Sequence, residues 1–497
     1  MNVNTAQSVA HKLMNPDIWG GKMYARGWKR SQNGTAQVTD KSTGEILATV
    51  ANASVAEIRE ASRLAVSAGE QWAKVSSQTR AAILRRAGEI LDQYSEEVVY
   101  WLIRESGSPR LKALLEVRAT KEYLYHAADI AVHPTMKVLK NDDDLLSSIE
   151  RVPLGVVGVI APFNFPLTLA LRSIAAALAM GNSVVLKPSL NTAVSGGVVI
   201  ARVFEEACLP EGVLQVLPGG DEAGAALTDD PYVAMIAFIG SAAVGRKIGR
   251  TAGSTLKRMS LELGGKNPFL VLSDADLESA ARAGAFSTFF HQGQICMAVG
   301  IHFVHESLID RYAARVAELG KGIKVGDPYL DQVGLGPIVS EKQRDHVHSL
   351  VEEAIRLGAE LLEGGSFQGL FYRPTVLKNV PHDARAFKEE IFGPVAVIVS
   401  FKDESEAIRL ANGTGYGLTA SVFGELQRAR KVGEQIETGM LHINDTTLIA
   451  DVKAPFGGVK GSGNFTRIGG GASIEEYTTW RWTTETRQPT SYEIPTG

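Results

Sequence analysis

The chain has 497 residues, which at roughly 100–200 residues per domain allows about two to four domains. Its net charge is −4, with 45% apolar and 21% charged residues, so it lacks the basic excess that a nucleic-acid partner requires. Two cysteines are too few for a disulfide framework, and neither a span of ~20 apolar residues nor a signal-peptide core is present, so we expect a cytoplasmic protein that binds neither nucleic acid nor membrane.

The N-terminal region is predicted to be mainly helical. Apolar residues recur at helical spacing over 54–74, where Ser54 and Glu57 have the spacing of a capping box. Two more helices are predicted within 80–105, and Ser95 is the expected N-cap of the second.

Two segments have strand character but fit no core. Residues 136–151 are typical of two strands around an acidic turn, and 473–485 contains a second β-like run. We interpret the two segments as an arm that pairs subunits, with a surface hairpin as the alternative.

Residues 153–272 alternate short apolar strands with helices. Such alternation indicates βαβ units and a parallel sheet that is buried on both faces. Sheets of this kind bind nucleotides at the carboxyl ends of their strands. The predicted strands are 155–161, 183–187, 212–218 and 233–240, and the predicted helices are 167–180, 192–207, 222–229 and 242–252.

The alternation resumes with different spacing over 263–445, which predicts a second α/β domain. The strands expected there are 267–273, 300–305, 395–401 and 419–424, and the helices are 276–292, 307–320 and 340–358. The whole chain is therefore predicted to have an α/β fold.

The two cysteines differ in their surroundings. Cys296 follows Gly293 and Gln294, where the chain can turn sharply after the predicted helix. A thiolate is a strong nucleophile where a base or a polar environment supports it, so Cys296 is a candidate nucleophile, with a structural cysteine as an equal alternative. Cys208, at a helix end, fits a small buried structural residue.

Two polar residues lie among apolar neighbours. Glu262 stands between leucines in a predicted strand, where burial would raise its carboxyl pKa and suit it to general base catalysis; alternation along the strand would instead point it to solvent. Asn164 lies in "APFNFP", on a loop stiffened by two prolines. Its amide could donate to an oxyanion, and a turn-forming asparagine is the alternative.

Two further features suit a nucleotide. Lys187 ends a predicted strand, where a cation can bind a ribose hydroxyl or a phosphate, although a surface lysine is the alternative. In "FIGSAAVG", Gly240 and Ser241 join a strand to a helix whose N-terminal N–H groups favour a pyrophosphate. The stretch matches neither G-x-G-x-x-G nor a P-loop, and no histidine or cysteine spacing predicts a metal site.

Seven motifs occur in the order and spacing of the aldehyde dehydrogenase superfamily, between residues 20 and 485: "PFNFP", "LKPS", "FIGSAAVG", "LELGGKNP", "HQGQICMA", "EEIFGPV" and "PFGGVKGSG". The resemblance implies an enzyme that oxidises an aldehyde with NAD or NADP and forms a homodimer or homotetramer. It also implies three parts, which are a Rossmann-type nucleotide-binding domain over 1–132 and 152–262, a catalytic domain over 263–461, and an oligomerisation arm over 133–151 and 470–490.

The resemblance also implies roles for individual residues. Cys296 is similar to the catalytic thiol, Glu262 to the general base, and Asn164 to the amide that stabilises the oxyanion together with the backbone N–H of Cys296. Glu390 and Phe392 resemble the pair that holds the nicotinamide ribose and ring. The other implied cofactor contacts are Ile160, Pro162, Lys187, Gly240, Ser241 and Gly245.

The chain departs from the superfamily at two positions. Leu190 stands three places after Lys187, where many members have an acidic residue that favours NAD over NADP. We expect NAD, because no phosphate clamp is evident nearby, and NADP stays possible. Arg467 lies near the place of the glutamate in a "GRELG" motif of many members, so Glu262 is expected to act without that partner.

The motifs "HQGQICMA", "HIND" and "RIGGGASIEEYT" and Arg172 resemble the aromatic aldehyde branch, the benzaldehyde and vanillin dehydrogenases. That branch implies an aromatic aldehyde as substrate, with Arg172 at the ring and Phe165, Phe290 and Ile295 completing the pocket. A structural salt bridge is the alternative for Arg172.

Four other functions stay open at this point. They are an aliphatic or semialdehyde dehydrogenase, a coenzyme A-acylating enzyme, a cofactor-independent cysteine acyl hydrolase, and a nucleotide-binding protein without activity. Glu262 weighs against the acylating enzyme, which needs no hydrolytic base. The retention of Cys296, Glu262, Asn164 and Lys187 together weighs against lost activity.

Overall fold

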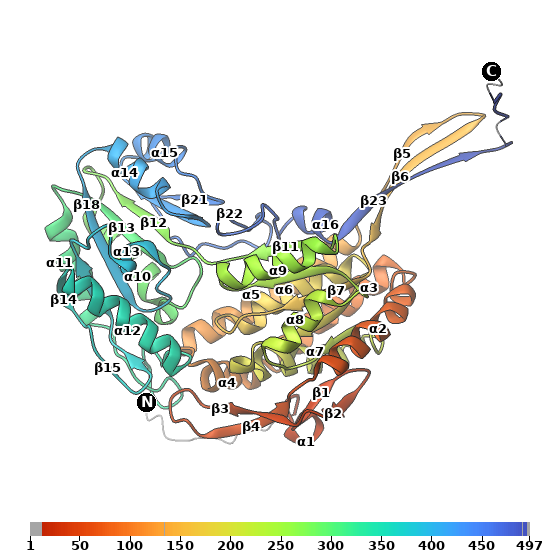
Figure 1. Ribbon diagram of the computed structural model, residues 1–497, viewed down its shortest axis with the longest axis horizontal. Helices are drawn as coiled ribbons and strands as arrows, with labels where there is room; N and C mark the ends of the chain where they lie inside the picture. Colours follow the sequence, from red (N-terminus) through yellow and green to blue (C-terminus); the bar gives the residue numbers. More distant parts are fainter. Residues whose placement is uncertain (1–11, 134, 490, 495–497) are drawn as a thin grey trace.

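The computed structural model describes residues 12–133, 135–489 and 491–494. It has two lobes, each built around a seven-stranded sheet, and a thin arm that projects from one of them (Figure 1). None of the described helices is both long and apolar enough to cross a bilayer.

The sheet of the first lobe has the order β11-β10-β7-β8-β9-β1-β2, and its first five strands are parallel neighbours. β7 and β8 are buried at every position, as expected for apolar strands covered by helices on both faces. The strands are β1 (Lys22–Tyr24), β2 (Trp28–Arg30), β7 (Val156–Ile160), β8 (Ser183–Lys187), β9 (Leu214–Val216), β10 (Val233–Ile239) and β11 (Arg258–Glu262), and β3 (Thr35–Thr39) pairs with β4 (Ile46–Ala51) beside them.

Helices cover this sheet, and the predicted alternation of strands and helices is confirmed. The capping box of Ser54 and Glu57 is present at the start of α2. The helices of the lobe are α1 (Pro16–Trp19), α2 (Val55–Trp72), α3 (Ser77–Gln93), α4 (Ser95–Ser106), α5 (Arg110–Ala131), α6 (Pro166–Ala179), α7 (Val199–Glu206), α8 (Asp221–Asp229) and α9 (Ala242–Ser254).

Two local predictions in this lobe are wrong, and one predicted helix has an irregular first turn. Ser95 is the first residue of α4 and not its N-cap, because α3 runs to Gln93 and leaves only Tyr94 between the helices. The helix predicted over 192–207 begins with a π-helical turn, Val194–Val198, where the buried carboxylate of Glu105 accepts two backbone N–H groups. Cys208 is exposed, because the chain turns there with a φ of 58° at the end of α7.

The sheet of the second lobe has the order β14-β17-β18-β13-β12-β20-β21. The strands are β12 (Asn267–Val271), β13 (Val299–His305), β14 (Glu360–Glu363), β17 (Thr375–Lys378), β18 (Val395–Phe401), β20 (Thr419–Phe423) and β21 (Met440–Ile443). Two short antiparallel pairs are separate from this sheet: β15 (Phe367–Gln368) with β16 (Phe371–Tyr372), and β19 (Tyr416–Gly417) with β22 (Val459–Lys460). Its helices are α10 (Leu277–Phe289), α11 (Ile309–Lys321), α12 (Glu341–Arg356), α13 (Arg385–Lys388), α14 (Glu404–Asn412) and α15 (Leu426–Gly433).

The helix predicted over 276–292 ends earlier than expected. α10 stops at Phe289, and a short turn, Phe290–Gly293, follows in which His291 and Gln292 both have left-handed backbones with φ of 51° and 57°. Such conformations are unfavourable for residues other than glycine and cluster at functional sites. The side chain of Gln292 donates to two backbone carbonyls and so holds this turn in place.

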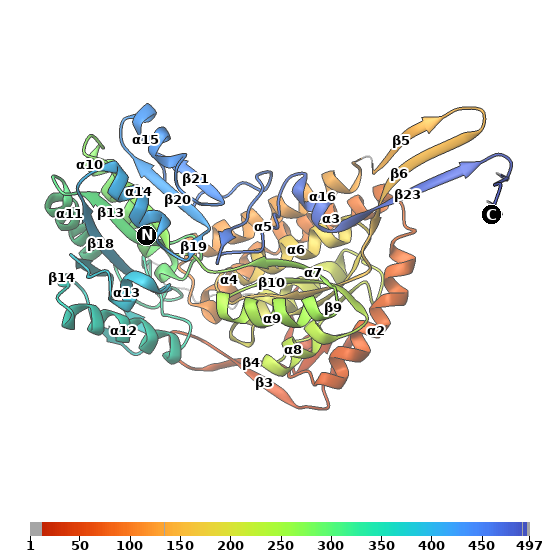
Figure 2. The same cartoon turned by 45° about the horizontal axis from the view of Figure 1, so that its top comes forward.

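The arm is a three-stranded antiparallel sheet of β5 (Met136–Asn141), β6 (Leu145–Pro153) and β23 (Thr478–Thr486). Figure 2 shows β23 running outward along the hairpin to the C-terminal end. The two predicted strands and the C-terminal run are therefore confirmed, except that residues 472–476 form a short helix, α16 (Ala472–Glu476), before the strand begins.

Candidate active site

A cavity of about 1200 Å³ lies where the carboxyl ends of β7, β8, β10 and β11 meet the second lobe. Ten of the predicted site residues line it: Ile160, Pro162, Asn164, Lys187, Gly240, Ser241, Glu262, Cys296, Glu390 and Phe392. Its position at the strand ends is the one expected for a nucleotide in a parallel sheet.

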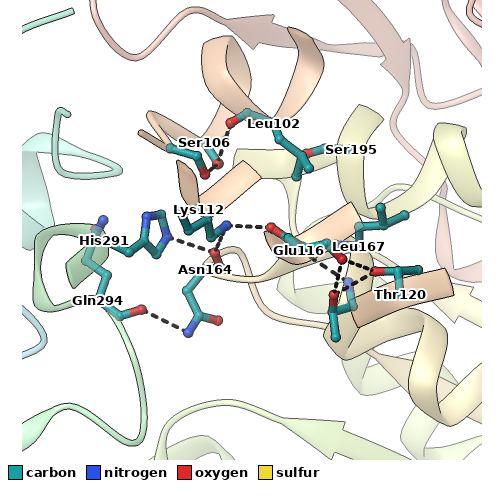
Figure 3. A network of polar contacts seen from close by, with 12 residues as sticks. Leu102, Ser106, Lys112, Glu116, Thr120, Asn164, Leu167, Ser195, His291 and Gln294 are labelled. Carbon is teal, nitrogen blue, oxygen red and sulfur yellow. Dashed lines mark hydrogen bonds and ion pairs between the residues drawn. The ribbon is translucent and has the colours of Figure 1, made fainter. Parts of the chain in front are cut away.

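Asn164 lies in the loop between β7 and α6 and is 3% exposed. Its side-chain nitrogen donates to the carbonyl of Gln294 at 2.9 Å, while its own carbonyl accepts from Lys112 and lies 2.8 Å from Nε2 of His291 (Figure 3). One amide N–H is thus tied to the segment that leads to Cys296, and the second stays available for an oxyanion. The interpretation as a merely turn-forming asparagine does not account for these contacts.

Cys296 lies in a loop held by close backbone contacts. Asn267 donates to the carbonyls of Cys296 at 2.8 Å and of Ala298 at 2.7 Å. Gly265 allows this approach, because a Cβ there would lie 2.6 Å from the Cys296 carbonyl oxygen. Asn267 stands in the "GGKNP" stretch, and sequence reasoning missed its role because only the fold brings it to the cysteine loop.

Burial raises the pKa of the Cys296 thiol to about 12, although Arg172 opposes the shift. Glu390 and Glu262 raise it further through their charges. Since the thiolate is the reactive form, Cys296 requires a base to remove its proton as it attacks.

Glu262 is the last residue of β11 and is 3% exposed, so the prediction of a buried carboxylate is confirmed. Neither of its oxygens has a hydrogen-bond partner among the described residues. Burial raises its pKa to about 8, and the positive charges of Arg172 and Arg467 limit the rise. A buried, unpartnered carboxylate with a pKa near neutrality has the properties of a general base.

The chain around Glu262 fits closely. Gly457 lies beside it, and a Cβ there would come within 2.4 Å of the Thr466 carbonyl oxygen and 2.9 Å of a Glu262 oxygen, so the backbone contact requires glycine. Arg467 donates from one nitrogen to the carbonyls of Gly458 and Thr466, which fixes its guanidinium beside this segment. A second carboxylate, Glu476, is also buried and raises the pKa of Glu262 by its charge. The sequence carried no signal for Glu476.

Arg172 lies in α6 and is 3% exposed, with its guanidinium 4.4 Å from the ring centre of Phe456. Nε and Nη2 have no hydrogen-bond partner, and the described residues include no carboxylate in an ion pair with it. Within the described residues, the structure therefore does not support the alternative of a structural salt bridge for Arg172. A buried guanidinium with free donors is suited to a ligand.

The three other predicted pocket residues lie around the cysteine segment. Phe165 packs edge-on against the His291 ring, and Phe290 stacks on Phe286, whose side chain is exposed. Ile295 is buried and lines a separate cavity of about 20 Å³ that Glu390 and Phe392 share. None of the four predicted substrate-pocket residues lines the large cavity.

Glu390 and Phe392 enter the cavity from the second lobe. Glu390 accepts the N–H of Gly265 at 3.0 Å, and burial raises its pKa to about 7, opposed by Lys266. Phe392 has a left-handed backbone with φ of 54°, and its ring meets Phe163 edge-on at 5.8 Å.

Lys187 also lines the cavity and is 9% exposed, and its side-chain nitrogen has no hydrogen bond or ion pair within the described parts of the chain. Burial lowers its pKa, opposed by Asp221. Ser241 caps α9, whose N-terminus opens on the cavity. An unpartnered buried ammonium beside a helix N-terminus fits the ribose and phosphates of a dinucleotide.

Two details here differ from expectation. Gly245 does not line the cavity; it packs against Leu263, where a Cβ would lie 2.4 Å from that side chain. The cavity lining includes Arg59 of α2 and Lys247 of α9, two cations that could meet a phosphate. Arg59 lies far from Leu190 in the sequence, so the sequence alone showed no clamp.

A parallel sheet whose nucleotide-sized cavity ends at a cysteine and an unpartnered carboxylate is typical of a dehydrogenase with a thiol nucleophile. A model of the aldehyde dehydrogenase family matches residues 28–483. The chain belongs to this family, and it is an NAD(P)-dependent aldehyde dehydrogenase.

Relatives and solved structures agree with this assignment. The chain is 47% identical to a vanillin dehydrogenase of Amycolatopsis sp. over 95% of its length and 98% of the relative, and 45% identical to the benzaldehyde dehydrogenase [NAD(+)] of Pseudomonas putida over 96% and 98%. Its fold matches an NADP dependent enzyme of E. coli with a TM-score of 0.91, 31% identity and coverage of 96% and 100%. An aldehyde dehydrogenase of Bacillus cereus in complex with NAD+ has a TM-score of 0.90, 32% identity and coverage of 94% and 96%.

Proposed function

We propose that the protein oxidises an aromatic aldehyde, similar to benzaldehyde or vanillin, to its carboxylate through a thioester on Cys296. The observation that carries the proposal is that Cys296, Glu262 and Asn164 line the same cavity. The names of the similar vanillin and benzaldehyde dehydrogenases support the aromatic substrate. Arg172, with free donors above Phe456, supplies a cation that can stack on a ring or donate to its substituent.

In the first half of the reaction the thiol of Cys296 loses its proton to water, and its sulfur bonds to the carbonyl carbon of the aldehyde. The carbonyl oxygen becomes negative and accepts hydrogen bonds from the free amide N–H of Asn164 and the backbone N–H of Cys296. Each such donor typically stabilises the transition state by about 3–4 kcal/mol. Lys187, the N-terminus of α9, Glu390 and Phe392 would hold a nicotinamide cofactor, which would supply the hydride acceptor needed to convert this adduct into a thioester.

In the second half Glu262 removes a proton from water as the water oxygen adds to the thioester carbon. Asn164 again stabilises the oxyanion, the carbon–sulfur bond breaks, and the thiol of Cys296 regains a proton. The overall change consumes aldehyde, oxidised cofactor and water and releases carboxylate, reduced cofactor and two protons.

The first test follows reduced-nicotinamide absorbance with benzaldehyde, vanillin, succinate semialdehyde and a short aliphatic aldehyde. We expect turnover with the aromatic substrates and none after Cys296→Ala. Turnover with aliphatic substrates alone would be consistent with the chemistry of Cys296 and Glu262 but would refute the aromatic assignment. Dependence on coenzyme A would favour an acylating enzyme, and ester hydrolysis without cofactor would favour a hydrolase.

We propose that the enzyme accepts NADP as well as NAD, because Leu190 offers no charge to repel a 2′-phosphate and Arg59 offers a positive charge to bind it. Leu190→Glu should then lower kcat/KM with NADP by about tenfold or more, while Leu190→Gln, the uncharged control, should not. An equal loss with both cofactors in the glutamate variant would refute the charge argument.

We also infer that the arm binds a second copy of this chain. Five large side chains lie exposed along its strands, namely Met136, Val138, Leu139, Trp480 and Trp482. Exposed apolar groups on edge strands are typical of an interface. Light scattering should give a dimer or tetramer that Trp482→Arg weakens; a monomeric wild type would refute the inference.

A further inference from the structure

A closed polar network lies behind Asn164, away from the large cavity. Lys112 and Glu116 of α5 form an ion pair of 2.5 Å with both side chains 0% exposed. Figure 3 shows Lys112 between Glu116 and the Asn164 backbone, with His291 approaching from the opposite side. None of these three partners was predicted from the sequence.

The carbonyl of Asn164 is the centre of the network. Lys112 donates to it at 2.7 Å, and Nε2 of His291 lies 2.8 Å from it. Burial and the charge of Lys112 lower the pKa of His291 well below its usual value, so the ring is neutral and donates through Nε2. Two donors from different elements therefore fix the backbone that carries the Asn164 amide.

Glu116 connects this carbonyl to the start of α6. One of its oxygens accepts from Lys112, and the other accepts the N–H groups of Leu167 and Thr168 at 3.0 and 3.3 Å. α6 has no capping side chain of its own, since Phe165 stands at its N-cap. The carboxylate of α5 thus caps α6 and, through Lys112, sets the loop that ends at Asn164.

Stability alone does not explain a charged pair at this place. Buried ion pairs are often no more stabilising than apolar residues of similar volume, because both charges lose their hydration. An apolar pair here would leave the Asn164 carbonyl with His291 as its one remaining donor and the first turn of α6 without a cap. What the charges add is a defined position for this loop.

We propose that Lys112 and Glu116 are positioning residues that hold the Asn164 amide where the oxyanion forms. The inference rests on the proposed function, in which Asn164 is the oxyanion donor. The pair touches neither the cavity nor Cys296; Lys112 contacts the Asn164 carbonyl and lies 4.3 Å from the ring centre of Phe165, so its effect on the oxyanion passes through Asn164. A small displacement of such a donor is enough to slow catalysis.

The test is a double-mutant cycle with Asn164→Ala. Lys112→Met combined with Glu116→Gln removes both charges at nearly constant volume and should lower kcat by about 10- to 100-fold, because the donor is displaced. In the Asn164→Ala background the same pair should add less than about threefold, since the group through which it acts is gone. The cofactor Kd and the rate of Cys296 alkylation by iodoacetamide, which forms no oxyanion, should stay unchanged.

Glu105→Gln is the matched control, because Glu105 is a buried carboxylate that accepts N–H groups of Val194 and Ser195 and has no contact with the Asn164 loop. Glu105→Gln should leave kcat unchanged in both the wild-type and the Asn164→Ala backgrounds. The positioning role would be overturned if the paired substitution left kcat unchanged. It would also be overturned if the pair lowered kcat by the same factor with Asn164→Ala as without it. If the paired variant does not fold, Glu116→Gln alone is measured, with the same non-additivity expected. An Asn164→Ala enzyme with wild-type kcat would instead refute the proposed oxyanion role itself.

Discussion

Two carboxylates line the cavity from opposite lobes, the buried Glu262 and the half-buried Glu390, and their surroundings differ. Glu390 accepts the N–H of Gly265 and lies near Lys266, and its pKa rises to about 7. Glu262 has no hydrogen-bond partner within the described residues, and its pKa rises to about 8. A hydrogen bond to the ionised form holds a carboxylate in place to bind a ligand, whereas an unpartnered carboxylate is free to exchange a proton. The comparison predicts that the two residues serve different steps.

The largest effect is expected from Glu262→Gln. Loss of a general base typically costs about 10²–10⁴ in rate, and here the loss should fall on thioester hydrolysis. Pre-steady-state absorbance should therefore show a burst of reduced cofactor followed by slow turnover. Glu476→Gln, which removes a neighbouring buried carboxylate that does not line the cavity, serves as the control and should show no such burst. Hydrolysis at the wild-type rate in the Glu262 variant would end the distinction between the two carboxylates.

A smaller effect is expected from Glu390→Gln. The glutamine oxygen can still accept from Gly265, but the charge that would bind the cofactor ribose is lost. A hydrogen bond to a charged group is worth about 1.5–3 kcal/mol, so kcat/KM for the cofactor should fall by about tenfold or more. Single-turnover hydrolysis of the thioester should keep its wild-type rate. A variant that accumulated thioester would show that Glu390 also serves the second step.

The pH dependence separates the carboxylates further. Because the pKa of Glu262 is raised to about 8, the residue is protonated at lower pH and only the ionised fraction acts as a base. The hydrolysis rate should rise about tenfold per pH unit and level off above about 8. Stopped-flow measurements from about pH 5.5 to about pH 9.5 would show this, and a rate that levelled off near about pH 5 would contradict a raised pKa.

The strands that carry the cavity-lining residues of the first lobe are well predicted from the sequence. The apolar strands 156–160 and 233–239 are recognisable because parallel strands covered on both faces are apolar throughout. Polar residues at the carboxyl ends of the neighbouring parallel strands, such as Lys187 of β8 and Glu262 of β11, then fall at the same edge of the sheet. Local pattern and topology together are enough for those positions.

The supporting residues could not be predicted in this way. Lys112 and Glu116 have the spacing of an ordinary surface ion pair on a helix, and only the packing of α5 on α6 buries them. The left-handed His291 and Gln292 continue a helical pattern in sequence, and the bonds from Gln292 to Gly107 and Pro337 interrupt it. Such contacts join residues far apart in the chain and leave no periodic signal.

The smallest effect tests what sets the pKa of Glu262. Arg467 is one of the two cations that limit its rise, and it has no place in the proposed reaction. Arg467→Met should raise the pKa of Glu262 further, because the ionised carboxylate loses a positive charge that stabilises it, and so shift the hydrolysis profile to higher pH. A shift of about half a pH unit lowers the rate at pH 7 by about threefold. Arg467→Lys keeps the charge and should restore the profile. If methionine and lysine gave the same profile, the charge of Arg467 would not reach Glu262, and burial alone would set its pKa.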